Sequence, residues 1–254
     1  MSHTGTIRCG NAKDIQMTSI RRMMLAGVAA CAVGLGLAAT ATAAPTFTFK
    51  VQTANQNGVQ FDATNTSPGF NFAGAITATF NYNGPLDFNL NAGQNNNNKG
   101  DRNSAFFGAN AGAISGYSGS GSLAAPSGAR FSTLARFLGS SGSASGYQYG
   151  SLYTIGLGTL AAGTHLTIRH DDGVSVFQGG TRINTTTAGP TVAITETVVL
   201  TTAGDTTLYF GRQNGSPSIL TVTVPEPASM ALFGAGLLGL AMVRRRSRKS
   251  NAAA

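Results

Sequence analysis

The chain has 254 residues, 34 of them glycine, with no tryptophan and only 10% charged side chains. This length predicts one domain or two small ones, and the shortage of strong helix formers argues against a helical protein. The formal charge of +8 comes from the two ends, because residues 44–223 hold eight basic and seven acidic side chains, which leaves +1. The charge distribution therefore argues against nucleic-acid binding.

The first 43 residues predict a removable secretory signal. Arg21 and Arg22 form a positive region, an apolar stretch follows over 23–37, and residues 41–43 form a small-residue cleavage site. We therefore expect residues 1–43 to be a signal peptide with an N-terminal extension and a signal helix.

Three alternatives remain open for this segment: a twin-arginine signal, a lipoprotein box ending at Cys31, and an uncleaved membrane helix. The apolar stretch is shorter than the ~20 residues that a membrane span needs, which favours cleavage. Translation could start at Met1 or at Met17. Cys9 also precedes the cleavage site, so we expect the mature domain to have no thiol and no disulfide.

Residues 44–223 predict an all-β domain, an antiparallel β-sandwich or jelly roll. Runs of β-branched and aromatic residues, several with period-2 alternation, recur between glycine and asparagine turns. These predicted strands are 46–53, 75–82, 150–157, 165–170, 174–177, 192–200, 206–210 and 219–224.

The segments between these strands differ from them in composition. The asparagine-rich stretch 91–103 and the Gly/Ser-rich stretches 115–127 and 140–146 predict mobile loops. The stretch 132–138 is compatible with one helical turn or a short strand.

The most informative stretch of the domain is His170-Asp171-Asp172-Gly173. Adjacent carboxylates repel each other unless a cation or hydrogen-bond donors compensate them, and Ca²⁺ binds carboxylate and carbonyl oxygens. We therefore treat Asp171 and Asp172 as candidate Ca²⁺ ligands, and all four residues as a candidate ligand-binding site. The alternative is a hairpin turn in which the carboxylates only accept backbone N–H bonds, with His170 as an exposed residue at the strand end.

This stretch resembles the Asp-Asp-Gly motif of protective-antigen-type β-sandwich domains, in which the aspartates of some members bind Ca²⁺ and help to hold a sugar. The later stretch 209–220 is similar to the closing hairpin of that family. The matching residues are Asp171, Asp172, Gly173, Val176, Phe177 and Gly180.

The last 31 residues, 224–254, predict a sorting tail. Val224-Pro225-Glu226-Pro227 is followed by an uncharged stretch over 228–243, which is suited to a short transmembrane helix. The basic cluster after it stops transfer on the cytoplasmic side; its members are Arg244, Arg245, Arg246, Arg248 and Lys249.

This tail resembles the PEP-CTERM sorting signal. The resemblance implies recognition by an exosortase, a transient anchor in the cytoplasmic membrane, and final residence in the cell envelope or the exopolysaccharide of a biofilm. A plain C-terminal membrane anchor is the alternative.

The sequence does not favour catalysis. The mature region holds Glu196 and six aspartates, and a glycosidase needs two carboxylates that face each other across the substrate. Asp87 and Glu196 could meet in space, although nothing in their context favours it. Only His165 and His170 remain as histidines, with no zinc or nucleophile motif.

We therefore expect an exported, exosortase-processed surface or matrix protein that is not an enzyme. A Ca²⁺-dependent carbohydrate-binding module and a secreted polysaccharide hydrolase are the alternatives. Expected partners are an exosortase, the membrane and exopolysaccharide, and no nucleic acid.

Overall fold

The computed structural model describes residues 45–90, 102–183, 186–224, 236 and 239. The predicted signal at 1–43, the Pro-Glu-Pro motif at 225–227 and the basic cluster at 244–249 lie outside these residues, as does nearly all of the predicted membrane helix. Among the residues that are described, no helix is long and apolar enough to cross a membrane.

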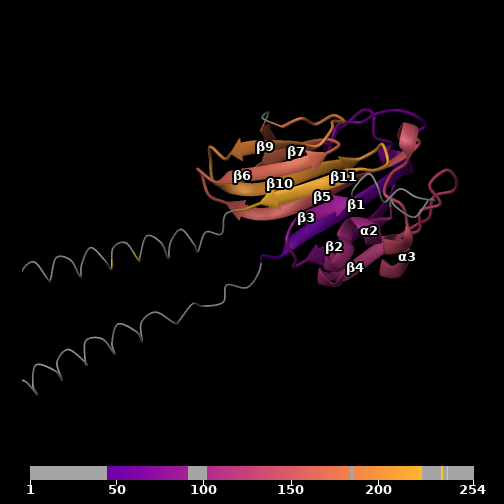
Figure 1. The fold of residues 1–254 in the computed structure, drawn as a ribbon, viewed down its shortest axis with the longest axis horizontal. Helices are drawn as coiled ribbons and strands as arrows, with labels where there is room; N and C mark the ends of the chain where they lie inside the picture. Colours follow the sequence, from indigo (N-terminus) through magenta and orange to yellow (C-terminus); the bar gives the residue numbers. More distant parts are fainter. Residues whose placement is uncertain (1–44, 91–101, 184–185, 225–235, 237–238, 240–254) are drawn as a thin grey trace, which may run out of the picture. The chain divides into compact units, whose positions relative to one another are not determined.

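Eleven described strands form two antiparallel sheets (Figure 1). The larger sheet has seven strands in the order β4 (Ile114–Ser120), β2 (Ile76–Tyr82), β1 (Phe47–Asn55), β5 (Tyr149–Leu160), β10 (Gly204–Arg212), β7 (Val174–Gln178) and β8 (Thr181–Ile183). The smaller sheet has four, in the order β3 (Asp87–Leu90), β11 (Ser218–Thr223), β6 (His165–Asp171) and β9 (Ile194–Val199). All neighbouring strands in both sheets run antiparallel.

The main core lies between the two sheets. Strand side chains alternate between the two faces, so β1 buries Phe47, Phe49 and Val51 and exposes Thr48 and Lys50. The smaller sheet contributes residues such as Phe88, Leu166 and Leu220 to the same apolar cluster. Every residue of both core clusters lies between residues 47 and 224, so this domain holds its own core.

Two short helices, α2 (Asn103–Phe107) and α3 (Leu134–Gly139), close one side of the core near β2, β3 and β4 (Figure 1). Phe106 and Phe107 of α2 pack on Phe88 with ring centroids 5.1 Å away in both cases. Short 3-10 helices lie at Phe72–Gly74, Gly108–Ala113 and Ser145–Tyr147.

Buried Arg212 ties α2 to the larger sheet. Its guanidinium lies 4.3 Å from the ring centroid of Phe106 and donates 2.8 Å and 3.0 Å bonds to Asn103 Oδ1 and the Tyr153 hydroxyl. The prediction of a mobile loop through Asn103 is wrong at that residue, because its side chain is fully buried in this network.

The two sheets and their core confirm the predicted antiparallel β-sandwich, and all eight predicted strands are present. Three expectations about the connecting segments need correction or completion. Part of the predicted loop 115–127 is strand β4, and the predicted loop 140–146 contains buried Ser140 and Ser143. The undecided stretch 132–138 forms most of helix α3.

Candidate functional site

The Asp171-Asp172-Gly173 segment carries the chain from one sheet to the other. Strand β6 ends at Asp171 in the smaller sheet, and β7 begins at Val174 in the larger one. These strands do not pair with each other, so the expectation of a hairpin turn is wrong. Asp172 adopts a φ of 63°, in the left-handed region that non-glycine residues rarely occupy.

Gly173 is required at this crossover by close backbone packing. A Cβ atom on Gly173 would lie 1.7 Å from the carbonyl oxygen of Ala188. The neighbouring N–H of Val174 donates a 2.8 Å bond to Thr187 O. The segment around 186–192 therefore lies directly over the crossover.

A second crossover, at residues 212–218, runs beside the first. It joins β10 of the larger sheet to β11 of the smaller sheet, so the closing hairpin expected over 209–220 is not formed. The N–H of Gly211 donates a 2.9 Å bond to Gly173 O, and the N–H of Gln213 donates a 2.8 Å bond to Asp172 Oδ2. The two crossovers are thus fastened to each other.

Two further loops are tied to the second crossover. The buried Gln213 amide donates 2.8 Å to Phe61 O and accepts 2.9 Å from the N–H of Phe61. Asn214 Oδ1 accepts a 3.1 Å bond from the N–H of Gly146. The loops around Phe61 and Gly146 therefore complete this end of the sandwich.

The two crossovers, the segment at 190–192 and the loop at Tyr147 surround a pocket of about 400 Å³ at the two aspartates. None of the described residues that line it is a lysine, an arginine or a histidine. Asp171 and Asp172 are 7% and 4% exposed, whereas Val192 at the rim is 77% exposed. The lining residues are Tyr147, Asp171, Asp172, Pro190, Thr191, Val192, Asn214, Ser216 and Pro217.

Burial disfavours the charged form of both carboxyl groups. Burial raises the pKa of Asp172 to about 7; the backbone N–H of Gln213 opposes the rise, and the neighbouring charge of Asp171 adds to it. Burial also raises the pKa of Asp171, against lowering by the backbone N–H of Asp172 and by His170. A bound cation would stabilise the ionised form of both groups.

His170 lies behind the pocket and does not line it. The expectation of an exposed residue is wrong, because its ring is fully buried. One ring nitrogen, Nδ1, lies 2.7 Å from the carbonyl oxygen of Asp172, and Nε2 lies 3.0 Å from Glu196 Oε2. His170 therefore holds the crossover backbone in place from within the domain.

Glu196 links His170 to the segment that covers the crossover. Its carboxylate accepts bonds from the Thr187 N–H at 3.0 Å and 3.1 Å and from the Thr187 hydroxyl at 2.8 Å. Burial raises the pKa of Glu196, but the bonds from Thr187 and His170 outweigh it and leave the pKa lowered.

The oxygen atoms at the pocket suit a hard cation such as Ca²⁺. The described part of the chain holds no group of three or more His, Cys, Asp or Glu side chains that could hold a metal ion. Ca²⁺ here would therefore take two carboxylates and complete its shell with neutral oxygens. Ser216 Oγ, which is buried and has no hydrogen-bond partner among the described atoms, is one neutral oxygen at this pocket.

Four residues that the sequence does not assign to the site take part in it or support it: Gln213, Ser216, Tyr147 and Glu196. The sequence of 209–220 predicts a hairpin, whereas in the structure part of this stretch forms a wall of the pocket. Nothing in the sequence around Tyr147 indicates that it reaches the aspartates. Of the predicted sorting residues, only Val224 is described, and it packs partly buried against the main core.

No curated protein matches the chain. Two solved structures resemble it, and one is the PA14 sugar-binding domain from an RTX adhesin, with 18% identity and a TM-score of 0.41, covering 73% of this chain and 92% of that one. The other is the PA14 domain of the MpAFP antifreeze protein, with 13% identity and a TM-score of 0.33, covering 70% and 81%. At these identities and TM-scores the likeness does not identify a ligand.

The tail gives a more direct result. A family model described as the PEP-CTERM protein-sorting motif matches residues 223–246, the segment that carries Pro225-Glu226-Pro227 and the start of the basic cluster. This protein therefore carries a PEP-CTERM sorting motif, which directs export, processing by an exosortase and delivery to the cell surface.

Proposed function

We propose that this protein is a non-catalytic component of the cell surface or its exopolysaccharide matrix, and that the Asp171–Asp172 pocket binds carbohydrate through Ca²⁺. The observation that carries this proposal is the pair of buried carboxylates facing a pocket with no cationic side chain among its described lining residues. Ca²⁺ would supply a positive charge within the pocket itself. Its remaining positions would accept neutral oxygens, and paired hydroxyls of a sugar are suitable ligands.

The rim of the pocket supports a carbohydrate as the ligand. Half-buried Tyr147 and exposed Val192 offer apolar surface to the C–H face of a sugar ring. Exposed Asn214 lies beside them, and its side-chain NH₂ group can donate hydrogen bonds to hydroxyls.

The positions of Asp87 and Glu196, the two distant acids that could have formed a catalytic pair, favour a binding role over a hydrolytic one. Asp87 lies on β3 and Glu196 on β9, the two opposite edges of the smaller sheet. Their carboxylates accept hydrogen bonds from Thr221 and Thr187, respectively. Two carboxylates placed in this way do not flank a common substrate.

The test is calorimetric titration of Ca²⁺ into the fragment 44–224, which contains both core clusters. We expect saturable binding that Asp171→Asn/Asp172→Asn abolishes. Asp205→Asn is the matched control, because it removes an exposed carboxylate that is hydrogen-bonded to Thr159 on the larger sheet.

A glycan screen in Ca²⁺ and then in EDTA follows from a positive titration. Glycan binding that EDTA removes would support the proposal. A folded fragment that takes up no Ca²⁺ would leave the aspartates as structural residues of the crossover, and turnover of a polysaccharide would replace the non-catalytic role with a hydrolytic one.

Surface retention is tested separately in the full chain. Glu226→Ala changes the sorting motif without touching the described domain. We expect the uncleaved precursor to accumulate in the membrane fraction, whereas the natural chain reaches the surface or matrix.

A further inference from the structure

The outer face of the seven-stranded sheet is rich in hydroxyl and amide groups. Cross-strand pairing aligns one row of outward residues over six strands: Asn81, Thr48, Gly156, Thr207, Phe177 and Arg182. The next row runs through Thr79, Lys50, Thr154 and Tyr209. Their neighbours along the strands, such as Phe49 and Leu208, are buried on the opposite face.

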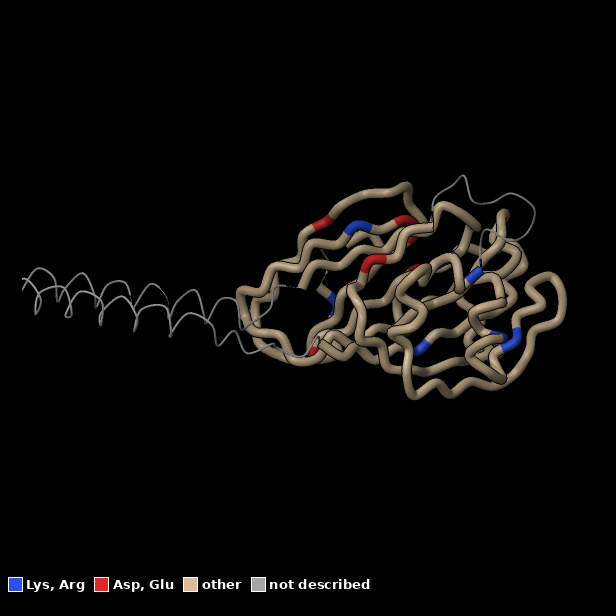
Figure 2. The backbone as a smooth tube through the Cα atoms, turned by 60° about the horizontal axis from the view of Figure 1, so that its bottom comes forward, with Lys and Arg blue, Asp and Glu red and all other residues tan. Residues whose placement is uncertain are grey.

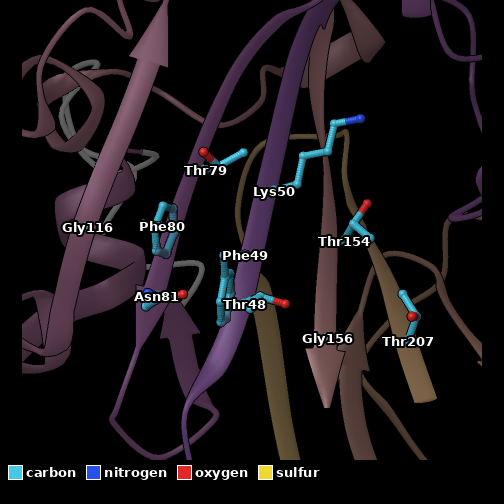
Figure 3. Close-up of a pocket in the computed structure, with 10 residues that line it drawn as sticks. All are labelled: Thr48, Phe49, Lys50, Thr79, Phe80, Asn81, Gly116, Thr154, Gly156 and Thr207. Carbon is cyan, nitrogen blue, oxygen red and sulfur yellow. The ribbon is translucent and has the colours of Figure 1, made fainter. Parts of the chain in front are cut away.

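A groove of about 380 Å³ lies along these rows (Figure 3). Gly156 lines this groove, and the absence of a side chain there makes room for Thr48, because a Cβ atom on Gly156 would lie 2.3 Å from Thr48 Oγ1. Thr154 and Thr207 line the same groove from β5 and β10. The groove therefore lies on the face of the larger sheet and not at the crossovers that form the aspartate pocket.

An aromatic pair continues the groove toward β7. Phe177 and Tyr209 have ring centroids 5.0 Å apart at an interplanar angle of 70°, and both rings are partly exposed. Phe177 is the cross-strand neighbour of Thr207, and Tyr209 that of Thr154. Hydroxyls in the groove suit the polar edges of sugar rings, and the aromatic rings suit their apolar C–H faces.

The groove carries one positive charge. Exposed Lys50 is the one charged residue among the ten described residues that line it, and none of them is acidic (Figure 3). Arg182 stands at the β8 end of the first row. Across the whole described domain, charged positions are sparse and scattered (Figure 2), so these residues form no broad basic surface.

We propose that this face binds a segment of an acidic polysaccharide, with a uronate carboxylate at Lys50 and sugar rings against Phe177 and Tyr209. Neighbouring strands are about 4.8 Å apart, so the path from β2 to β7 is about 19 Å long. That length suits an internal stretch of a chain and exceeds a single sugar. The site is independent of the proposed Ca²⁺ site, because none of its residues belongs to the aspartate pocket.

The test is a titration of the fragment 44–224 with oligogalacturonate in the presence of EDTA. Binding is monitored through the chemical shifts of the backbone amides. The Asp171→Asn/Asp172→Asn variant is titrated in parallel, so that failure of the Ca²⁺ site does not affect the result. We expect shifts at Thr48, Lys50, Thr154 and Thr207, and weaker shifts with a neutral glucan oligomer of equal length.

Two variants measure the contacts. Lys50→Gln should weaken oligogalacturonate binding about tenfold while leaving the weak glucan binding unchanged. Thr48→Val/Thr207→Val removes two hydroxyls at constant size. It should weaken the binding of oligogalacturonate and of the glucan by about tenfold each. Thr197→Val is the matched control, because it removes an exposed hydroxyl from β9 on the other sheet.

Three outcomes would overturn the proposal. The first is the absence of shifts on this face in a folded fragment, or shifts confined to Asp172 and Asn214. The second is equal affinity for the neutral and acidic oligomers. The third is a set of shifts at Thr48 and Thr207 that depends on protein concentration alone, which would assign the face to a second copy of the chain.

Discussion

The carboxylate of Asp172 accepts a 2.8 Å hydrogen bond from the backbone N–H of Gln213, 41 residues later in the chain. The two residues lie on the two crossovers that join the sheets at this end of the sandwich. Gln213 is fixed in turn by its paired bonds with the backbone of Phe61. A change in the ionisation of Asp172 therefore acts on the connection between the sheets.

The first prediction is that the fragment 44–224 loses stability as the pH rises from 5 to 8. Asp172 has a pKa of about 7 in the folded domain and an ordinary value of 3.8. The folded state therefore holds a proton that the unfolded chain releases, and this contribution to stability disappears as the pH passes through 7. Asp171 acts in the same direction, because burial raises its pKa as well.

Thermal unfolding followed by circular dichroism measures this effect. Asp172→Asn should flatten the decline, because an amide does not titrate. Glu196 does not interfere, because the stability that its lowered pKa contributes is lost only as the pH falls below its ordinary value of 4.5. A melting temperature that is constant or rises between pH 5 and pH 8 would contradict the prediction.

The second prediction concerns Ca²⁺ and pH together. Ca²⁺ binds the ionised carboxylates, and protons compete for the same oxygens. At a fixed Ca²⁺ concentration, the rise in melting temperature should therefore be larger at pH 8 than at pH 5. Equal rises at both pH values, or a rise that persists in Asp171→Asn/Asp172→Asn, would place the ion elsewhere.

Strand β1 was predictable from the sequence because its side chains alternate. In β1, Phe47, Phe49 and Val51 are buried and Thr48 and Lys50 are exposed, and this pattern is visible in the residues themselves. Strand β4 has no such pattern. Its sequence ISGYSGS is typical of a flexible loop. The segment forms a strand in the structure because it pairs with β2.

The candidate site was predictable only in part. The aspartates are adjacent in the chain, so their mutual repulsion could be inferred directly. The wall opposite them, at Tyr147 and Ser216, is brought near by the fold and carries no local signal. The position of His170 near a strand end predicts exposure, whereas the fold buries its ring and places Glu196 of the neighbouring strand β9 beside it.

The third prediction is that His170→Ala destabilises the domain by about 2–4 kcal/mol. The substitution leaves a cavity, and it removes the partner of both Glu196 Oε2 and the Asp172 carbonyl oxygen. His165→Ala is the matched control, because His165 begins the same strand and is exposed. Urea unfolding would measure the loss in the free energy of unfolding for each variant. A loss for His170→Ala that is no larger than that for His165→Ala would show that the buried contacts contribute little.

The fourth prediction is that Gly173→Ala disrupts the crossover, whereas Gly139→Ala is tolerated. A Cβ atom on Gly173 would meet the backbone oxygen of Ala188 at 1.7 Å, so the main chain must move. Nothing lies within 4 Å of a Cβ atom on Gly139. We expect a loss of about 3 kcal/mol or more for the first variant. Equal melting temperatures for the two variants would show that the segment over the crossover yields easily.

The fifth prediction concerns the buried polar network around Arg212. Asn103 Oδ1 accepts bonds from both Arg212 Nη1 and the Tyr153 hydroxyl, and all three side chains are fully buried. Tyr153→Phe removes one hydroxyl from this network without changing the ring. We expect a cost of about 1–2 kcal/mol, because the buried groups left behind have no water to bind.

Tyr117→Phe is the matched control for that network. Its hydroxyl donates a 2.8 Å bond to the carbonyl oxygen of Phe131 at a partly buried position, where water can replace it, so we expect a loss below about 1 kcal/mol. A double-mutant cycle then joins Tyr153→Phe to Asn103→Ala. Because both act on one network, their costs should add to more than the cost of the double variant; strict additivity would mean that Asn103 and Tyr153 stabilise the domain independently.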